Sequence, residues 1–251
     1  MLEFHDCILQ LLPLGIHNEI YNQWVERTGR LLDLSDMNPE NNPLLLPNVL
    51  DAPLTEKGIA QCVEQRAGIA RRVGGAALDN VELIISSPLV RCLQTAHVTF
   101  EDFLPYNTNE LRREVKWIAH DGIREELGCL LCNKCGPLSE TIDLFPMVDY
   151  THLSYSGEND EMWDKYVMNN SNEDGTPRRE TIEGMSHRAY DFFVNFLLSR
   201  PEKEIVVVGH SHWFLAMTKA VLDVDESDES FVIPVFGQAE LRSMELVFTK
   251  Q

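Results

Sequence analysis

The sequence predicts an α/β protein of three layers, α/β/α, with helices on both faces of a mostly parallel central sheet. Three observations lead to this fold class. Short apolar runs typical of buried parallel strands occur at 83–85 and 205–208. Amphipathic helical patterns alternate with those runs, and one extends from Thr181 to Leu198. The 251 residues suffice for one well-cored domain, which we expect to span residues 1–251.

The N-terminal part of the chain predicts one strand and one long loop. Cys7–Leu12 is the first strand candidate and runs directly into a loop. Residues 35–53 contain four prolines and several Asn and Asp residues, which oppose regular structure. We therefore expect a long surface loop at 35–53 and regard it as a candidate contact region.

The next segment predicts a helix, a strand and a second helix. Thr55 is suited to cap a helix of about 18 residues. An inward-facing stripe on that helix consists of Ile59, Cys62, Ala70 and Val73. Residues 83–85 form a short buried strand. A helix then begins near Pro88, because proline is favourable in the first turn of a helix.

The C-terminal half predicts an irregular insertion followed by a regular helix–strand–helix unit. Residues 107–177 are irregular, with a strand near 115–119 and a short helix near 161–168. Thr181 opens the long amphipathic helix, and a parallel-type strand follows at 204–210. The last predicted helix covers 213–222. The long helix buries a core stripe made of Ile182, Met185, Ala189, Phe192, Phe196 and Leu197.

The charge balance limits the classes of partner. A formal net charge of −19 opposes binding to duplex nucleic acid or to an anionic membrane surface, since both favour basic proteins. Solubility explains such a charge, and a basic protein partner is the other possibility. No apolar run approaches the roughly 18 residues that a membrane helix needs, so we expect no membrane insertion. The first residues also resemble no secretory or transit peptide.

Six cysteines are spread through the chain, which predicts reduced thiols and an intracellular, reducing compartment. Three of them, Cys129, Cys132 and Cys135, form a C-x2-C-x2-C run that suggests a metal or iron–sulfur site. A fourth nearby ligand is missing, and the continuation found in bacterial ferredoxins is absent. We therefore favour ordinary thiols and predict no metal, although metal binding by these three residues stays open.

Three predicted strand ends carry residues suited to phosphate chemistry. Arg91 stands in the first turn of a helix, where a guanidinium and free N–H groups can meet an anion together. His210 stands where a strand gives way to a helix, and Glu125 and Glu126 are candidates for a general acid. Taken alone, a residue of each of these kinds at such a position usually has a structural role and no function in binding or catalysis. Together, at the carboxyl ends of strands in an open α/β sheet, they predict a ligand site.

The chain at this point resembles the histidine phosphatase superfamily, in its phosphoglycerate-mutase-like, plant and algal branch. The segments "DAPLTEKGIAQC", "SSPLVRCLQTA", "REELGCLLC", "FPMVDYTHL" and "VVVGHSH" are similar to that branch, in the same order along nearly the whole chain. The resemblance implies the phosphoglycerate mutase-like fold and no cofactor. It assigns the second phosphate-binding arginine to Arg91, the second histidine to His210 and the proton donor to Glu125. Asn18 matches a pocket asparagine.

The family's catalytic motif is missing from this sequence. Members of the family end the first strand in Arg-His-Gly, where the histidine becomes phosphorylated and the arginine binds phosphate. Counting back from Asn18 places Leu11, Leu12 and Pro13 at these three positions. The segment "CNKC" also departs from the branch's C-D-x-R, since Asn133 and Cys135 remove a charged pair. An isobutyl group cannot form a phosphohistidine, so no catalytic residue set is expected intact.

These departures predict a catalytically inactive member with a binding, regulatory or assembly-subunit role. The alternatives are a residual phosphatase or phosphomutase acting on a small phosphate ester, and a sensor that binds phosphate anion through Arg91 and His210. Residual activity would need His17 or His210 as a substitute nucleophile, and His17 is expected in the loop after the first strand. A further hypothesis pairs Arg91 with Glu125 once the phosphate ligands of the first strand are lost.

Overall fold

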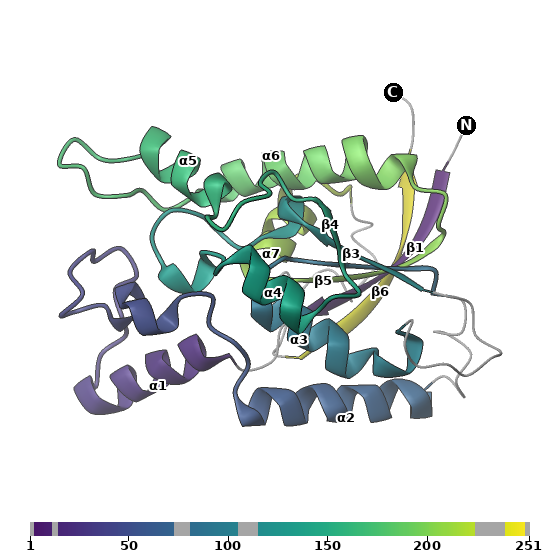
Figure 1. Cartoon of the computed structure of the whole chain (residues 1–251), viewed down its shortest axis with the longest axis horizontal. Coiled ribbons are helices and arrows are strands. Elements are labelled where there is room, and N and C mark those ends of the chain that lie inside the picture. Colours follow the sequence, from purple (N-terminus) through teal and green to yellow (C-terminus); the bar gives the residue numbers. More distant parts are fainter. Residues whose placement is uncertain (1–2, 12–14, 73–80, 105–114, 224–238, 249–251) are drawn as a thin grey trace.

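A six-stranded sheet forms the centre of the molecule (Figure 1). The computed structural model describes residues 3–11, 15–72, 81–104, 115–223 and 239–248. The strands are β1 (Glu3–Leu11), β2 (Leu83–Ser86), β3 (Lys116–His120), β4 (Asp149–His152), β5 (Glu204–Gly209) and β6 (Leu241–Phe248). Their order across the sheet is β4-β3-β2-β5-β1-β6.

Strands β1 to β5 run parallel, and β6 joins the edge antiparallel to β1. The predicted mostly parallel sheet is therefore confirmed. The edge strand β6 was not predicted, because its alternating sequence lacks the continuous apolar run that marks the central strands. An antiparallel edge strand on an otherwise parallel sheet is common in α/β proteins.

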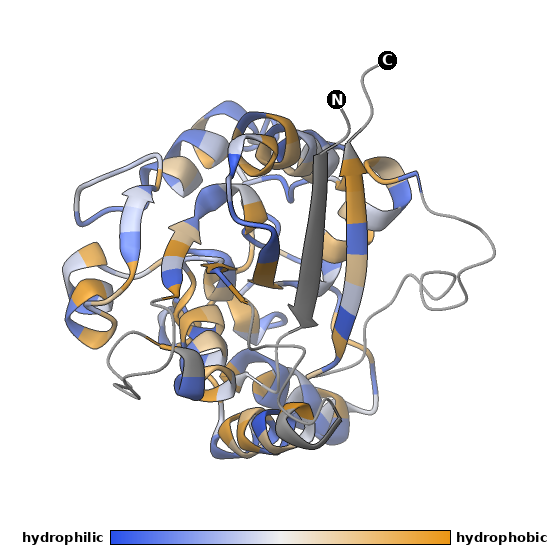
Figure 2. Ribbon diagram, turned by 90° about the vertical axis from the view of Figure 1, so that its right-hand side faces the viewer, coloured by the Kyte–Doolittle hydropathy of each residue, from blue (hydrophilic) through white to orange (hydrophobic). Residues whose placement is uncertain are grey.

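Helices cover both faces of the sheet, which gives the predicted three layers. The helices are α1 (Ile16–Thr28), α2 (Glu56–Arg72), α3 (Val90–Thr99), α4 (Leu138–Leu144), α5 (Glu161–Asn169), α6 (Ile182–Asp191) and α7 (Ser211–Ala220). Helices α6 and α7 cover one face, and α3, backed by α2, covers the other (Figures 1 and 2).

The alternation of side chains along β2 explains both interfaces. Leu83 and Ile85 pack in the same apolar cluster as Trp213 of α7, whereas Ile84 packs in the cluster that contains Leu93 of α3. All five side chains are fully buried. A strand covered on both faces must be apolar at every position, as the sequence of β2 is.

Local capping signals place two helices where the sequence predicts them. The Thr55 hydroxyl accepts a hydrogen bond of 3.0 Å from the Gly58 N–H at the start of α2. Thr181 does the same for α6, accepting from the Gly184 N–H at 3.1 Å. Residues 192–196 continue α6 as a π-helical turn, and a 3-10 turn then extends to Ser199. The prediction of one long helical segment to Leu198 is confirmed.

The predicted core stripes need one correction. Ile182 is 38% exposed, because it occupies the first position of α6, before that helix meets the sheet. The other stripe residues of that segment are buried. On α2, Cys62 is buried and Ile59 is half-buried, while Val73 lies outside the described residues.

The loop at 35–53 is more ordered than expected. Two short 3-10 turns occupy Pro43–Leu45 and Pro47–Val49. Leu44 and Val49 are buried in an apolar cluster shared with α1, Cys129 and Cys132. This packing is the reason why the segment is not a plain surface loop.

The region 107–177 was predicted to be irregular apart from a strand near 115–119 and a short helix near 161–168, and the part that the structure describes is more regular than that. The strand and the helix are confirmed as β3 and α5, whereas α4 and β4 were not predicted. Tyr150 of β4 is tied to α4 through hydrogen bonds from its hydroxyl to the carbonyls of Thr141 and Phe145, at 3.3 and 3.2 Å. In the described part of the chain, every helix is too short or too polar to cross a membrane.

Candidate functional site

The carboxyl ends of three neighbouring parallel strands, β1, β5 and β2, meet at one edge of the sheet. Leu11 pairs in register with Gly209, the residue that precedes His210. Ser86 pairs with Val208, and the following Ser87 N–H donates to the Val208 carbonyl at 3.0 Å. The end of β1 therefore lies directly beside the strand end that carries His210. Leu12 and Pro13 lie outside the described residues.

Arg91 is fixed by the start of α3. The Asp51 carboxylate accepts hydrogen bonds of 2.9 Å from the Val90 N–H and from the Gly136 N–H, so it joins the first turn of α3 to the loop after Cys135. The Arg91 side chain is only 1% exposed. Its Nη1 donates to the Cys132 carbonyl, and its Nη2 donates to Asn133 Oδ1 at 2.9 Å.

The Nε–H group of this guanidinium is left over. Arg91 Nε is buried and has no hydrogen-bond partner among the described residues. No carboxylate of the described residues forms an ion pair with Arg91, whose printed contacts are a carbonyl, an amide and an imidazole. A buried cation without a paired anion is costly, so this site is electrostatically suited to receive an anion.

His210 is held between Arg91 and Ser87. Its Nδ1 lies 3.4 Å from Arg91 Nη2, and its Nε2 lies 2.9 Å from Ser87 Oγ. A guanidinium only donates, so Nδ1 must accept and Nε2 must carry the proton that is donated to Ser87. Burial lowers the pKa of His210 well below its usual range, and the positive charge of Arg91 lowers it further. The imidazole is therefore neutral near pH 7.

His17 belongs to the first turn of α1, so the prediction that it lies in a loop is wrong. Its ring packs closely on Gly15, and its Nδ1 is buried without a hydrogen-bond partner. Burial, and then the charge of Arg91, lower the pKa of His17 to about 3. A protonated His17 would in turn lower the pKa of His210 further.

Asn18, the predicted pocket asparagine, caps α1. Its side-chain carbonyl accepts a hydrogen bond of 3.0 Å from the Gly15 N–H. The helix was not predicted, although Gly15 and Asn18 form a capping pattern and Ile16, Ile20 and Tyr21 supply an apolar stripe that packs against the 35–53 segment.

Glu125 lies near this cluster without touching Arg91. Its negative charge acts on Cys92 and Cys132, which contact His210 and Arg91 respectively. The predicted Arg91–Glu125 ion pair is wrong, because the Cys132 carbonyl and Asn133 take the terminal nitrogens of Arg91. The Glu125 carboxylate instead lies 3.7 Å from His212 Nδ1.

Glu126 completes a second acidic group beside Glu125. It forms an ion pair with Arg179 and lies 3.4 Å from His212 Nδ1. Burial raises the pKa of Glu126, and the neighbouring Glu125 charge raises it further. Two adjacent carboxyls with one raised pKa can hold a proton, which is the property that a general acid needs.

The three cysteines of the C-x2-C-x2-C run do not converge. Cys129 and Cys132 belong to the apolar cluster beneath α1, whereas Cys135 packs with Leu89, Leu138 and Tyr155. Burial raises the pKa of each of the three thiols. Among the described residues, no three His, Cys, Asp or Glu side chains are grouped as metal ligands. The five cysteines whose side chains are described are free thiols.

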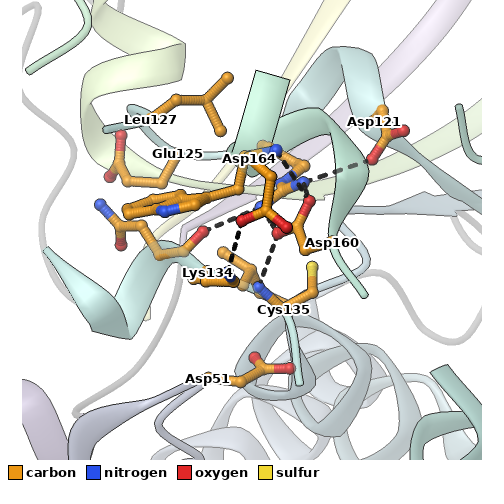
Figure 3. A network of polar contacts seen from close by, with 12 residues as sticks. Asp51, Asp121, Glu125, Leu127, Lys134, Cys135, Asp160 and Asp164 are labelled. Carbon is orange, nitrogen blue, oxygen red and sulfur yellow. Dashed lines mark hydrogen bonds and ion pairs between the residues drawn. The ribbon is translucent and has the colours of Figure 1, made fainter. Parts of the chain in front are cut away.

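A second buried arginine, Arg124, stands close to the site and is paired with a carboxylate. Its Nη1 donates to Asp160 Oδ1 at 2.8 Å and its Nη2 donates to Asp160 Oδ2 at 2.5 Å. Asp121 lies 3.7 Å away, and the Asn133 carbonyl accepts from Nη2 at 3.0 Å. Figure 3 shows Asp160 between this network and Cys135, whose N–H it also accepts at 2.9 Å.

Several residues of the site could not be singled out from the sequence. Ser87 and Cys92 contact His210 from the segment that carries Arg91, and nothing but their place in that segment distinguishes them. The role of the Cys132 carbonyl leaves no sequence signal, because a backbone acceptor has no residue preference. Asn133 was noticed as a missing charge, whereas the structure shows it as a direct acceptor for Arg91.

Comparison with known proteins shows the family that the chain is similar to. Residues 41–128 match the model of the histidine phosphatase superfamily, branch 1. The chain is 31% identical over 217 residues to phosphoglycerate mutase-like protein 1 of Arabidopsis thaliana, covering 78% of this chain and 71% of that protein. It is 27% identical to phosphoglycerate mutase-like protein 2 of the same plant, covering 81% and 67%.

Solved structures share the fold. A complex of ecdysone phosphate phosphatase from Bombyx mori with tungstate superposes with a TM-score of 0.53 at 15% identity, covering 98% of this chain and 92% of that one. A mycobacterial hydrolase superposes with a TM-score of 0.51 at 14% identity, covering 97% and 92%. At such identities the likeness shows the fold alone.

Proposed function

The chain belongs to the histidine phosphatase superfamily, and from this premise we propose that it binds a phosphate group without hydrolysing it, in a binding or regulatory role. The observation that carries the proposal is the pairing of a lost nucleophile with a retained cation site. Leu11 ends β1 and pairs with Gly209, the residue before His210, and the buried Arg91 forms no ion pair with a carboxylate among the described residues. The sequence places the lost arginine at Leu11 and the lost nucleophile at Leu12. Fold alone would not assign this role.

The retained groups support anion binding better than turnover. Arg91 supplies a charge and one unpaired N–H, and the neutral His210 is oriented by Ser87 and Arg91. Covalent phosphoryl transfer needs a nucleophilic imidazole at the end of β1, and leucine has no group that can attack phosphorus. Removing the nucleophile from such an enzyme costs several orders of magnitude in rate.

An enzymatic function is the second candidate, and one observation favours it. The His17 imidazole is neutral and lies within reach of the Arg91 charge. If this ring attacked phosphorus, the paired carboxyls of Glu125 and Glu126 would stand as proton donors nearby. In that case a small phosphate ester would be the substrate.

The experiment that tests the proposal compares turnover with binding. Purified parent protein, His210→Ala and Leu11→Arg/Leu12→His are assayed with an aryl phosphate, and phosphate binding by the parent is measured by calorimetry. His187→Ala, on the exposed side of α6, controls for contaminating phosphatase. We expect binding without turnover in the parent, and turnover gained by the double variant.

Two results would overturn the proposal. Turnover by the parent that disappears in His210→Ala would assign a rewired phosphatase. Absence of phosphate binding by the folded parent would remove the anion site altogether, and the search would move to protein partners. A possible protein partner or larger assembly remains part of the proposed role, since the surface charge of −19 suits a basic surface.

A further inference from the structure

Helix α4 lies in a stretch of chain that carries acidic residues without basic ones. Residues 135–164 contain seven Asp and Glu residues and neither Lys nor Arg, although the chain has 21 Lys and Arg among its 251 residues. Three of the seven form ion pairs with basic residues from outside the stretch, namely Asp160, Glu161 and Asp164. The other four are exposed and form no ion pair with a Lys or Arg of the described residues: Glu140, Asp143, Asp149 and Glu158.

Helix α4 packs on the body of the molecule through one of its sides. Leu138, Thr141 and Phe145 are buried there, and the hydrogen bonds from the Tyr150 hydroxyl hold the end of the helix in place. At its start, the Ser139 hydroxyl donates to the Glu158 carboxylate at 2.8 Å. Glu158 therefore joins the acidic residues of α4 from a separate segment of the chain.

The opposite side of α4 combines negative charge with apolar surface. Residues three and four apart on a helix are neighbours, so Glu140, Asp143 and Leu144 share one face. The Leu144 side chain is 62% exposed, and Ile142, on the other border of the acidic residues, is 40% exposed. Figure 1 shows α4 facing the viewer with no other helix in front of it. We call Glu140, Ile142, Asp143, Leu144 and Glu158 the α4 surface.

Helix α2 provides a comparison within the same molecule. It also exposes two carboxylates, those of Glu56 and Glu64, and an apolar side chain, Val63, which is 43% exposed. Lys57 and Arg66 stand among them, so both signs of charge are present on this helix. Mixed signs are typical of a surface that only faces water. A single sign of charge around exposed apolar side chains, as on the α4 surface, favours a partner of opposite charge.

The chemistry of the α4 surface identifies the kind of partner. Its carboxylates repel the phosphates of nucleic acids and of anionic lipids. A second copy of this chain would bring a further formal charge of −19 and is disfavoured for the same reason. A protein segment with Lys or Arg on one side and Leu-like residues beside them matches both parts, since it pairs with the carboxylates and covers Leu144 and Ile142.

We propose that the α4 surface docks a basic, amphipathic helical segment of a partner protein. The proposal goes beyond phosphate binding and does not depend on it. The loop before α4 is the one that holds Arg91, through the Cys132 carbonyl and Asn133. Gly136 of that loop is tied by Asp51 to the start of α3. A segment docked on α4 therefore binds next to the loop that holds Arg91.

The test uses the full chain and a fluorescein-labelled synthetic peptide of Lys and Leu, arranged to form an amphipathic helix of about five turns. Fluorescence anisotropy measures the affinity of this peptide for the parent, for Glu140→Gln/Asp143→Asn and for Leu144→Ser. All three substituted side chains are exposed, so the variants should fold as the parent does. We expect each α4 variant to weaken peptide binding by about fivefold.

Helix α2 supplies the matched controls. Glu56→Gln/Glu64→Gln changes the net charge as the α4 double variant does, and Val63→Ser removes a comparable exposed apolar side chain. We expect each control to weaken peptide binding by less than about twofold. Equal weakening by the controls and by the α4 variants would overturn the proposal, because the peptide would then respond to net charge alone.

Two further results would overturn the proposal. One is failure of the parent to bind the peptide. The other is sedimentation of the parent as a dimer that dissociates in Leu144→Ser, which would assign the α4 surface to a second copy of the chain. Hydrogen–deuterium exchange locates the contact, since added peptide should protect residues 138–144. Calorimetry with phosphate keeps the two proposals separate: the α4 variants should bind phosphate as the parent does, and a parent that binds the peptide but no phosphate would overturn only the proposed function.

Discussion

Arg91 and Arg124 are two buried arginines of the same region with opposite surroundings. Arg124 is fully buried and meets Asp160 through two parallel hydrogen bonds, with Asp121 nearby. Arg91 is equally buried, yet its partners are a carbonyl, an amide and an imidazole, and no carboxylate of the described residues forms an ion pair with it. The Nε atoms of both arginines lack a hydrogen-bond partner among the described residues. The two residues even share Asn133, which accepts from Arg91 through its side chain and from Arg124 through its backbone.

The difference separates an arginine that is paired with a carboxylate from one that is held by neutral groups. The bonds from Arg124 outweigh the effect of burial and lower the pKa of Asp160, as expected for an internal ion pair. That carboxylate also accepts from the Cys135 N–H and the Trp163 N–H, so it joins the site loop to α5. Arg91 joins elements too, but it has no carboxylate partner among the described residues, which is why we propose it as the anion-binding group.

The largest effect on stability is expected from Asp160→Ala, which would leave Arg124 buried without its main carboxylate partner, as Arg91 is. Removing one partner of a buried ion pair leaves an uncompensated charge, so the free energy of unfolding should fall by about 3–5 kcal/mol. Urea denaturation measures this loss. Asp164→Ala is the control, because its contact with Lys134 is exposed and should be worth less than about 1 kcal/mol (Figure 3). Equal losses of unfolding free energy in the two variants would show that the buried Arg124–Asp160 pair stabilises the protein no more than the exposed Lys134–Asp164 pair does.

The next effect is the loss of phosphate-dependent stability in Arg91→Met. At a phosphate concentration 100 times the dissociation constant, the parent should gain about 2.7 kcal/mol in its free energy of unfolding. Arg91→Met should gain nothing, since the charge that binds the anion is gone. Without phosphate, this variant should be less destabilised than Asp160→Ala, because it removes an unpaired charge along with its hydrogen bonds. Thermal denaturation with and without phosphate checks both statements.

The comparison also shows how much of the molecule could be predicted from its sequence. Thr55 and Thr181 cap the starts of their helices, as predicted. The apolar runs of β2 and β5 form buried central strands, also as predicted. Both features were predictable because helix capping and apolar runs are local sequence signals. The edge strand β6 was missed because its pattern is weak. Within 107–177, β3 and α5 were predicted, whereas α4 and β4 were missed, since these two short elements are stabilised by contacts such as those of Tyr150 and not by strong local propensity.

Within the site, residue types were predictable and pairings were not. Arg91, His210 and Glu125 were selected because their strand-end positions meet at one sheet edge. The Arg91–Glu125 pair failed, since the Cys132 carbonyl, 41 residues away in sequence, occupies that guanidinium. His17 was placed in a loop, because only the packing of its ring on Gly15 and the start of α1 reveal where it lies. Long-range contacts of this kind leave no local pattern.

The groups around the two arginines should also differ in how they make the free energy of unfolding depend on pH. On the Arg91 side, His17 has a pKa of about 3 and that of His210 is well below 6.5, so both are neutral when folded and become protonated at about 6.5 when unfolded. The unfolded state then binds more protons, and stability is lost as the pH falls below about 6.5. Each histidine contributes up to about 1.4 kcal/mol per pH unit, or about 2 kcal/mol between pH 6.5 and 5.

His17→Phe tests this assignment. The variant should lose one histidine's share of the slope of unfolding free energy against pH, whereas the exposed His187→Ala should keep the parent slope. Burial lowers the pKa of His120 to about 4, so His120 also contributes to the pH slope. This contribution is the same in every variant and does not affect the comparison. On the Arg124 side, the lowered pKa of Asp160 delays any loss to a more acidic range. A His17→Phe slope equal to that of the parent would contradict the buried, neutral state of His17.

The smallest effect, and the most direct test of the comparison, comes from Asn133→Asp. This change offers Arg91 a carboxylate at the position where Asn133 Oδ1 now accepts at 2.9 Å, so Arg91 would become paired as Arg124 is. The gain is reduced because Asn133 Nδ2 donates to the Glu126 carbonyl at 3.1 Å, and a carboxylate cannot. We therefore expect a net stabilisation of only about 1 kcal/mol in urea denaturation without phosphate.

Calorimetry should show weaker phosphate binding by Asn133→Asp at the same time, because the internal carboxylate competes with the anion for one guanidinium. Asn133→Ser, which leaves Arg91 without a carboxylate, is the matched variant and should keep the phosphate response. If Asn133→Asp bound phosphate as well as the parent, the unpaired charge of Arg91 would not be what attracts the anion.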